Sequence, residues 1–69
     1  MILYTPFWDT IHKKGITTYA LIKNYKVSSS TLSRLKRNMP ISTVTINDLC
    51  SILNCRVEDI LQYRADAQK

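Results

Sequence analysis

Apolar residues recur along the chain three and four positions apart, which is the spacing that gives a helix one buried face. Ile46, Leu49 and Leu53 show this spacing clearly, with Cys50 on the same face. The strict alternation typical of a half-buried strand is not sustained anywhere. The pattern therefore predicts an all-α protein. The expected helices span about residues 6–14, 18–25, 29–37, 43–53 and 57–63.

Hydroxyl residues and prolines mark where these helices begin and end. Thr5 before Pro6 is a typical start, because a Thr hydroxyl can accept from free amides and Pro at the first helical position loses no hydrogen bond. Caps are also expected at Thr17, at Ser28, and at Ser42 or Thr45. Asn38 and Pro40 should end the third helix, since Asn tolerates the left-handed conformation and Pro cannot continue a helix.

The periodicity also predicts which side chains face the core. The inward residues are expected to be Phe7, Trp8, Ile11, Leu21, Ile22, Tyr25, Leu32, Leu35, Ile46, Leu49, Cys50, Leu53, Val57, Ile60 and Leu61. The remaining tail, residues 64–69, is polar and is expected to fray. A chain of 69 residues with 45% hydrophobic residues can build one core, so a single domain over residues 1–69 is expected.

The connection between the second and third predicted helices is only three or four residues long, which forces a sharp crossing between them. Once Leu32 and Leu35 are buried, the third helix has one free face. That face carries Ser29, Ser30, Ser33, Arg34 and Arg37. Arginine can bond O6 and N7 of guanine, and serine can bond either base edge, so this face is typical of a helix that reads the major groove of DNA.

Charge is unevenly distributed along the chain, whose net charge is +5. No Asp or Glu lies between Thr10 and Asn47. The basic residues of that segment are Lys13, Lys14, Lys23, Lys26, Arg34, Lys36 and Arg37. Such segregation attracts polyanions, with nucleic acid first and an anionic membrane second, while a merely solvated basic surface is the alternative.

Neither a catalytic nor a metal site is expected. His12 is the only histidine, and Asp9 is its only plausible partner on the same helical face. Cys50 and Cys55 with one distant histidine fall short of a zinc set, so they are expected to be reduced core thiols. No cofactor or small-molecule ligand is expected. No apolar stretch approaches the roughly 20 residues that cross a bilayer, and no signal core is present, so the expected location is cytoplasmic.

The order of residues from Gly15 to Asn38 resembles a known family. It reads GITTYALIKNYKVSSSTLSRLKRN, which is similar to the Cro/C1-type (XRE) helix-turn-helix of bacterial and phage regulators, where the usual order is close to G-I-T-x-x-x-L-A-x-x-x-G-[VI]-S-x-x-T-[IL]-S-x-[IL]-x-x-G. The resemblance continues through Ile41 to Leu61. It implies a compact five-helix, lambda-repressor-like DNA-binding domain with the helix-turn-helix in the second and third helices.

Two positions depart from the family pattern. Ile22 stands where the family usually has Ala packed between the two helices, and Lys26 stands where the turn usually has Gly. The larger Ile22 side chain is expected to open the crossing angle slightly. Lys26 must adopt either a left-handed conformation, at a cost of about 1 kcal/mol, or a different turn.

The resemblance also implies roles for single residues. The residues implied to contact base edges are Ser29, Ser30, Ser33 and Arg34. Those implied to contact the phosphate backbone are Thr18, Lys36, Arg37, Asn38 and Thr43. Thr18 would be helped by the free amides at the amino end of its helix.

Together these features predict a transcriptional regulator of double-stranded DNA that represses by occlusion. One module of this size covers a half-site, so a homodimer on a palindromic site is expected, with half-sites about one helical turn apart. The fifth helix and the flanks of the first and fourth, including Tyr63 and Met39, are the expected interface. The second hypothesis is a protein-interaction module on the same fold, such as an antitoxin or adaptor. A small enzyme, for which His12 would be the only general base, ranks third.

Overall fold

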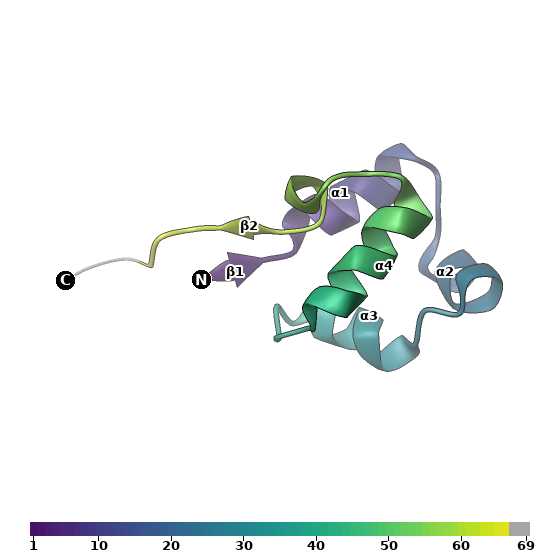
Figure 1. The fold of residues 1–69 in the computed structure, drawn as a ribbon, viewed down its shortest axis with the longest axis horizontal. Coiled ribbons are helices and arrows are strands. Elements are labelled where there is room, and N and C mark those ends of the chain that lie inside the picture. The colour runs from purple at the N-terminus through teal and green to yellow at the C-terminus, as the bar shows by residue number, and fades with distance from the viewer. Residues whose placement is uncertain (67–69) are drawn as a thin grey trace.

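The computed structural model describes residues 1–66, which form four α-helices and one two-stranded ribbon. The helices are α1 (Thr5–Lys13), α2 (Thr18–Tyr25), α3 (Ser29–Lys36) and α4 (Thr43–Leu53). A 3₁₀ turn, η1 (Val57–Asp59), follows, and strand β1 (Ile2–Leu3) pairs antiparallel with β2 (Gln62–Tyr63). Figure 1 shows the ribbon projecting from one end of the helical body, with α2 at the other end.

The first four helices agree with the sequence-based expectation, and most of their predicted caps are confirmed. Thr17, Ser28 and Ser42 each accept a hydrogen bond from the backbone N–H three residues further on, at 3.1 Å. The cap predicted at Thr5 is wrong, because α1 begins with Thr5 itself and makes no side-chain cap bond. In the first turn of α1, the N–H of Phe7 donates instead to the carbonyls of Tyr4 and Ile60.

The fifth helix predicted at residues 57–63 is not formed. η1 is a single turn, whose Asp59 carboxylate accepts from the N–H of Arg56 at 3.0 Å. The Ile60 carbonyl then accepts from Phe7 in α1, so it is not available to continue a helix. Residues 62–63 pair with β1, because a helix of only seven residues is marginal and the ribbon satisfies the same backbone groups.

The expected fraying of the tail is also wrong for the part that the structure describes. The N–H of Arg64 donates to the Met1 carbonyl at 2.9 Å, and the Met1 ammonium donates to the Arg64 carbonyl and, at 3.1 Å, to Asp66. Residues 67–69 lie outside the described residues. Among residues 1–66, no helix has the length and apolar character that a membrane span requires.

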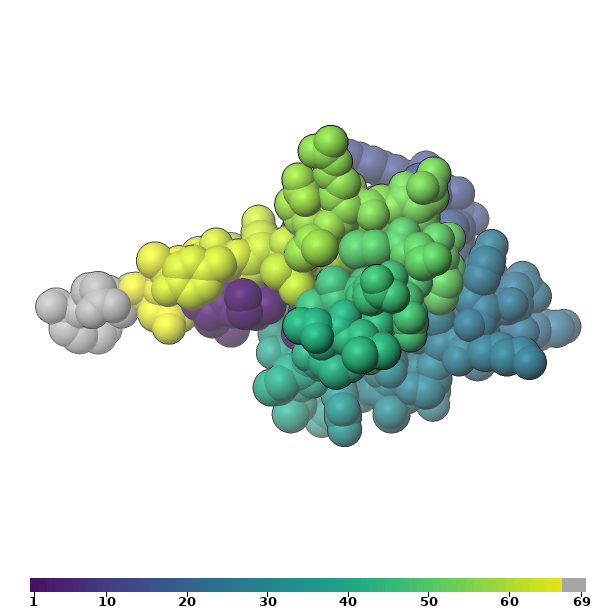
Figure 2. Space-filling model, in the orientation of Figure 1, coloured from purple at the N-terminus to yellow at the C-terminus, as the bar shows by residue number. Residues whose placement is uncertain are grey.

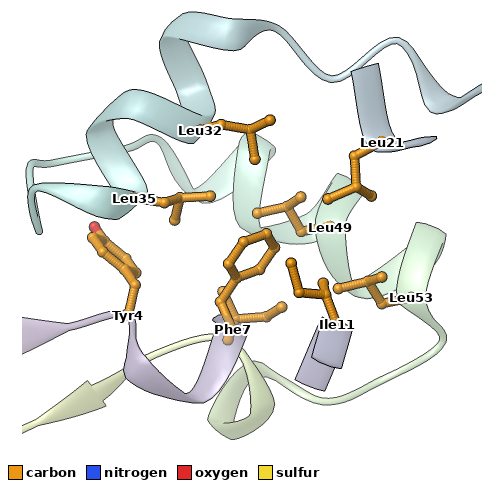
Figure 3. Packing of buried hydrophobic residues seen from close by; sticks show 9 residues of the cluster. Tyr4, Phe7, Ile11, Leu21, Leu32, Leu35, Leu49 and Leu53 are labelled. Carbon is orange, nitrogen blue, oxygen red and sulfur yellow. The ribbon is translucent and has the colours of Figure 1, made fainter. Parts of the chain in front are cut away.

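The core lies where α1, α3 and α4 meet. Figure 3 shows the Phe7 ring at its centre, with Ile11, Leu35 and Leu49 around it. The fully buried side chains are Phe7, Leu21, Leu35, Leu49, Leu53 and Ile60. Most of the predicted inward residues are thus confirmed. Phe7 takes the central place, and Trp8 is half-buried with its ring edge-on to Phe7 at a centroid distance of 4.9 Å.

Three predicted inward residues are wrong. Ile22, Tyr25 and Val57 are 43%, 47% and 52% exposed. α2 is only eight residues long, and Leu21 is its one buried residue, so Ile22 and Tyr25 remain largely exposed. Val57 lies in η1, where a single turn buries none of its own residues.

The two cysteines are free thiols that pack half-buried against the core. Burial raises the pKa of the Cys55 thiol to about 11, and the neighbouring Cys50 and Asp59 add to the rise. The thiolate is the reactive form of cysteine. Cys55 is therefore protonated at neutral pH.

We expect the Leu35→Ala variant to lose about 2–5 kcal/mol of unfolding free energy, because it leaves a cavity beside Phe7 in the centre of the core. Val44→Ala, at a position 67% exposed, is the control and should change stability by less than about 0.5 kcal/mol. Urea unfolding followed by circular dichroism measures both. Equal losses in the two variants would contradict the assignment of Leu35 to the core.

We also expect Cys55 to be alkylated by iodoacetamide at pH 9 more slowly in the folded chain than in the urea-unfolded chain. The unfolded thiol ionises near its ordinary pKa of 9.0, whereas the folded thiol ionises near 11. The stabilisation from the protonated thiol is therefore present below pH 9 and is lost as the pH rises toward 11. Mass spectrometry of the modified peptide follows the rate, and equal rates in both states would contradict the shift.

Candidate nucleic-acid interface

A turn of three residues joins α2 to α3, and its geometry depends on Lys26. Lys26 adopts the left-handed conformation, with φ of 59° and ψ of 30°. This allows the N–H groups of Lys26 and Val27 to reach the Leu21 carbonyl. Ser28, two residues after Lys26, is the N-cap of α3. Of the two alternatives expected for Lys26, the left-handed conformation is the one that occurs.

α3 has one face in the core and one in solvent. Leu35 is fully buried and Leu32 is 7% exposed. At about 100° per residue, Ser30 and Arg37 lie opposite these leucines, with Ser33 and Arg34 beside them. All four side chains are exposed. Ser29 and Lys36 lie nearer to α2, on the edge of the same face.

Some of these side chains already have partners within the chain. The Ser33 hydroxyl accepts from the Arg37 guanidinium at 3.3 Å, and Ser30 is 3.4 Å from the cap hydroxyl of Ser28. Among the described residues, Arg34 and Lys36 have neither a hydrogen-bond nor an ion-pair partner through their side chains. These two cationic groups are free to bind an anion or an acceptor outside the chain.

The residues with implied phosphate contacts lie around α3. Thr18 is the first residue of α2, and Thr43 is the first residue of α4. Figure 1 shows α2 beyond the amino end of α3, while α4 begins beside its carboxyl end. Arg37 and Asn38 lie where α3 ends. The set therefore flanks α3 at both ends.

Asn38 ends α3 in the left-handed conformation, with φ of 55°, as the sequence predicted. The sequence did not reveal its second contact, in which Oδ1 accepts from the N–H of Tyr4 at 3.0 Å. The Tyr4 hydroxyl in turn donates to the Met39 carbonyl at 2.9 Å. These two hydrogen bonds connect the end of α3 to the start of α1. The Nδ2 group of Asn38 makes no hydrogen bond to residues 1–66 and is available for an external contact.

A hollow of about 650 Å³ opens beside α3. It is lined by Trp8, Thr18, Ile22, Ser29, Leu32, Ser33 and Lys36. Ile22 was expected to lie between the helices and widen their crossing, but it faces this hollow and is 43% exposed. Trp8 and Ile22 thus add an apolar surface next to the polar face of α3. In the sequence, the one indication of this apolar surface was Ile22 at the position where the family usually has Ala.

The surface around α2 and α3 has uncompensated positive charge. The basic residues between Thr10 and Asn47 are all exposed. Among residues 1–66, the ion pairs join the Met1 ammonium to Asp66 and Arg56 to Glu58, so none involves these residues. Lys23 instead lies over the Tyr19 ring, with its Nζ 5.5 Å from the centroid. An unpaired basic surface of this kind favours a polyanionic partner.

The geometry agrees with what comparison with known proteins shows. Residues 7–66 match the family model of the Cro/C1-type HTH DNA-binding domain, and the chain belongs to this family. The crystal structure of the transcriptional regulator VanUg is similar to the fold, with a TM-score of 0.80 and 26% sequence identity. The match covers 88% of this chain and 81% of VanUg. No curated protein matches the chain in sequence.

We expect Lys26→Gly to stabilise the fold by up to about 1 kcal/mol, because glycine adopts the left-handed conformation of this turn without strain. Lys23→Gly is the matched control. It removes the same charge from within α2 and should destabilise by about 1 kcal/mol. Thermal unfolding measures both changes. A loss of stability in the Lys26→Gly variant would show that this turn is not strained.

Proposed function

We propose that the chain is a transcriptional regulator that binds a specific duplex DNA site by placing α3 in the major groove. The observation that carries the proposal is the free face of α3. Buried leucines fix the orientation of the helix, while its solvent-facing side carries serine hydroxyls and the Arg34 guanidinium, which has no partner among the described residues. These groups can bond base edges, and family membership makes DNA the natural ligand.

In this proposal the base contacts come from Ser29, Ser30, Ser33 and Arg34. Arg34 is the main specificity residue, because its guanidinium has no partner among residues 1–66 and can bond guanine bidentately. Ser33 is exposed on α3, and its hydroxyl accepts from the Arg37 guanidinium at 3.3 Å. Ser30 lies opposite the buried leucines, where a helix in the groove comes nearest to the bases.

Phosphate contacts then come from both sides of α3, from Thr18 at one end and from Lys36, Arg37, Asn38 and Thr43 toward the other. The amino ends of α2 and α4 offer backbone amides and a positive dipole beside Thr18 and Thr43. Contacts of this kind set the position of the protein on the duplex and make its affinity depend on salt.

The regulator acts as a homodimer and represses by occluding the promoter. One recognition helix reads only a few base pairs, and an interface with a single small module is usually too weak for tight specific binding. Two copies related by a two-fold axis read a palindromic site with half-sites about one helical turn apart. Residues 1–69 serve as one DNA-binding domain in this proposal.

Selection of duplexes from a random pool, followed by gel shifts over a salt series, tests the proposal. A regulator enriches a two-fold symmetric sequence, and its affinity falls linearly with salt on a log–log scale. A protein-interaction module on the same fold would enrich no sequence. That result would reject the proposed function.

We expect Arg34→Ala to cost about 1–3 kcal/mol of binding free energy on the selected site and to relax base preference at one position. Lys36→Ala should instead weaken binding evenly across sequences and reduce the salt slope by about one. Lys13→Ala, which removes the same charge from the end of α1, is the control and should do neither. Gel shifts on the selected site and its single-base variants measure all three. Identical behaviour of the Arg34 and Lys36 variants would contradict the division of roles.

A further inference from the structure

One wall of the hollow beside α3 comes from α3 itself. The residues of this wall are three and four positions apart, so they lie on one face of the helix. They are Ser29, Leu32, Ser33 and Lys36. Leu32 is 7% exposed, whereas the other three are exposed. This wall therefore has an apolar base and a polar rim.

The rest of the hollow comes from α1 and α2 and is mainly apolar. Trp8 of α1 is half-buried, and Ile22 of α2 is 43% exposed. Thr18, one turn before Ile22, adds a hydroxyl. Figure 2 shows α2, in blue, at the end of the molecule opposite the yellow ribbon, with the surface of α3 next to it. The hollow thus lies between three helices, and each contributes one apolar side chain to its base.

The hollow also has a positive charge. The Lys36 ammonium is the one charged group among the described residues that line it, and it has no partner within residues 1–66. Ser33 lies one turn before Lys36, so the two side chains can bind one carboxylate together. The Ser33 oxygen accepts from Arg37, and its own hydrogen can still be donated. The polar rim of the hollow therefore favours an anion.

We propose that the hollow binds a small aromatic carboxylate. Small-molecule sites are concave, roughly 300–1,000 Å³ in volume, and mostly apolar with a few polar groups. The hollow has about 650 Å³ and this kind of lining. The ring of the ligand packs against the indole of Trp8 and the side chains of Ile22 and Leu32, while its carboxylate binds Lys36. The sequence predicted no small-molecule ligand, because these apolar residues come from three separate helices.

A bound ligand of this kind competes with DNA. Several residues that line the hollow are also proposed DNA contacts, namely Thr18, Ser29, Ser33 and Lys36. A carboxylate at Lys36 neutralises a charge that a DNA phosphate needs. We therefore expect the ligand to release the regulator from its site. This release rests on the proposed function, whereas the binding of the ligand does not.

NMR of the isotope-labelled chain, with naphthoate as the probe, tests the site. Trp8 is the only tryptophan, so its indole N–H gives a single signal. Naphthoate should shift this signal and the amide signals of Ile22 and Leu32 until they saturate. Naphthalenemethanol has the same ring without the charge. It should bind about two- to fivefold more weakly at low salt, because it cannot pair with the exposed Lys36 ammonium.

Two variants test the two parts of the hollow. Ile22→Asn should weaken binding of both probes about tenfold, because it places an amide in the apolar base. Lys36→Gln should lower the affinity for naphthoate to that for the alcohol. The matched controls are Val57→Asn in η1 and Lys13→Gln in α1, which make the same changes at exposed positions outside the hollow. Neither control should change the affinity for either probe.

The comparison of the two probes on the wild-type chain tests the site even if Ile22→Asn fails to fold. Naphthoate that produces no saturable shift of the Trp8 indole signal would overturn the inference. Equal affinities of the two probes for the wild-type chain, or an affinity for naphthoate that Lys36→Gln leaves unchanged, would overturn it too.

Gel shifts on the selected duplex separate this inference from the proposed function. Naphthoate should release the wild-type chain, and about tenfold more should be needed to release Ile22→Asn. A chain that binds naphthoate at Trp8 but selects no DNA supports the site and rejects the regulator. A chain that selects DNA but binds no naphthoate rejects the site and leaves the regulator intact. Naphthoate and DNA bound to the chain together would overturn the competition.

Discussion

The burial of Leu32 and Leu35 is the constraint on which the rest of the structure depends. α3 is only eight residues long, and a helix of that length is marginal on its own. Packing of the two leucines beside Phe7 supplies the missing stability and also fixes the rotation of the helix. The same contacts that build the core therefore decide which side chains of α3 face solvent. Folding and recognition share one set of contacts.

The position of α3 along its axis is fixed at both ends by backbone geometry. At the amino end, left-handed Lys26 and the Ser28 cap hold the turn from α2. At the carboxyl end, Asn38 ends the helix and binds the Tyr4 amide, which fastens α3 to α1. A short helix with little core contact is thus held rigidly enough to present ordered side chains. The left-handed conformation of Lys26, which is strained for a residue with a side chain, is one of the features that hold α3 in place.

Local signals in the sequence predicted the four helices, three of their four caps and most of the core, because each depends on residues within one or two turns. They also limited Lys26 to two conformations, one of which occurs. The β ribbon and the bond between Asn38 and Tyr4 were not predictable in this way, because their partners lie 34 or more residues apart. The prediction that Ile22 faces the core was wrong, because helical periodicity does not tell how many turns of a short helix reach the core. For the candidate site, the exposed face of α3 was predicted from the sequence. The hollow beside α3 was not, because Trp8 of α1 lines it and the pattern within α3 does not say where α1 packs.

The central claim is that the outer face of α3 enters the major groove. The most direct measurement is NMR of the labelled chain bound to its selected duplex. The account predicts intermolecular contacts from the side chains of Ser30 and Arg34 to the cytosine H5 and thymine methyl protons, which lie in the major groove. Contacts of the duplex confined to other surfaces, with the α3 side chains unchanged, would contradict it.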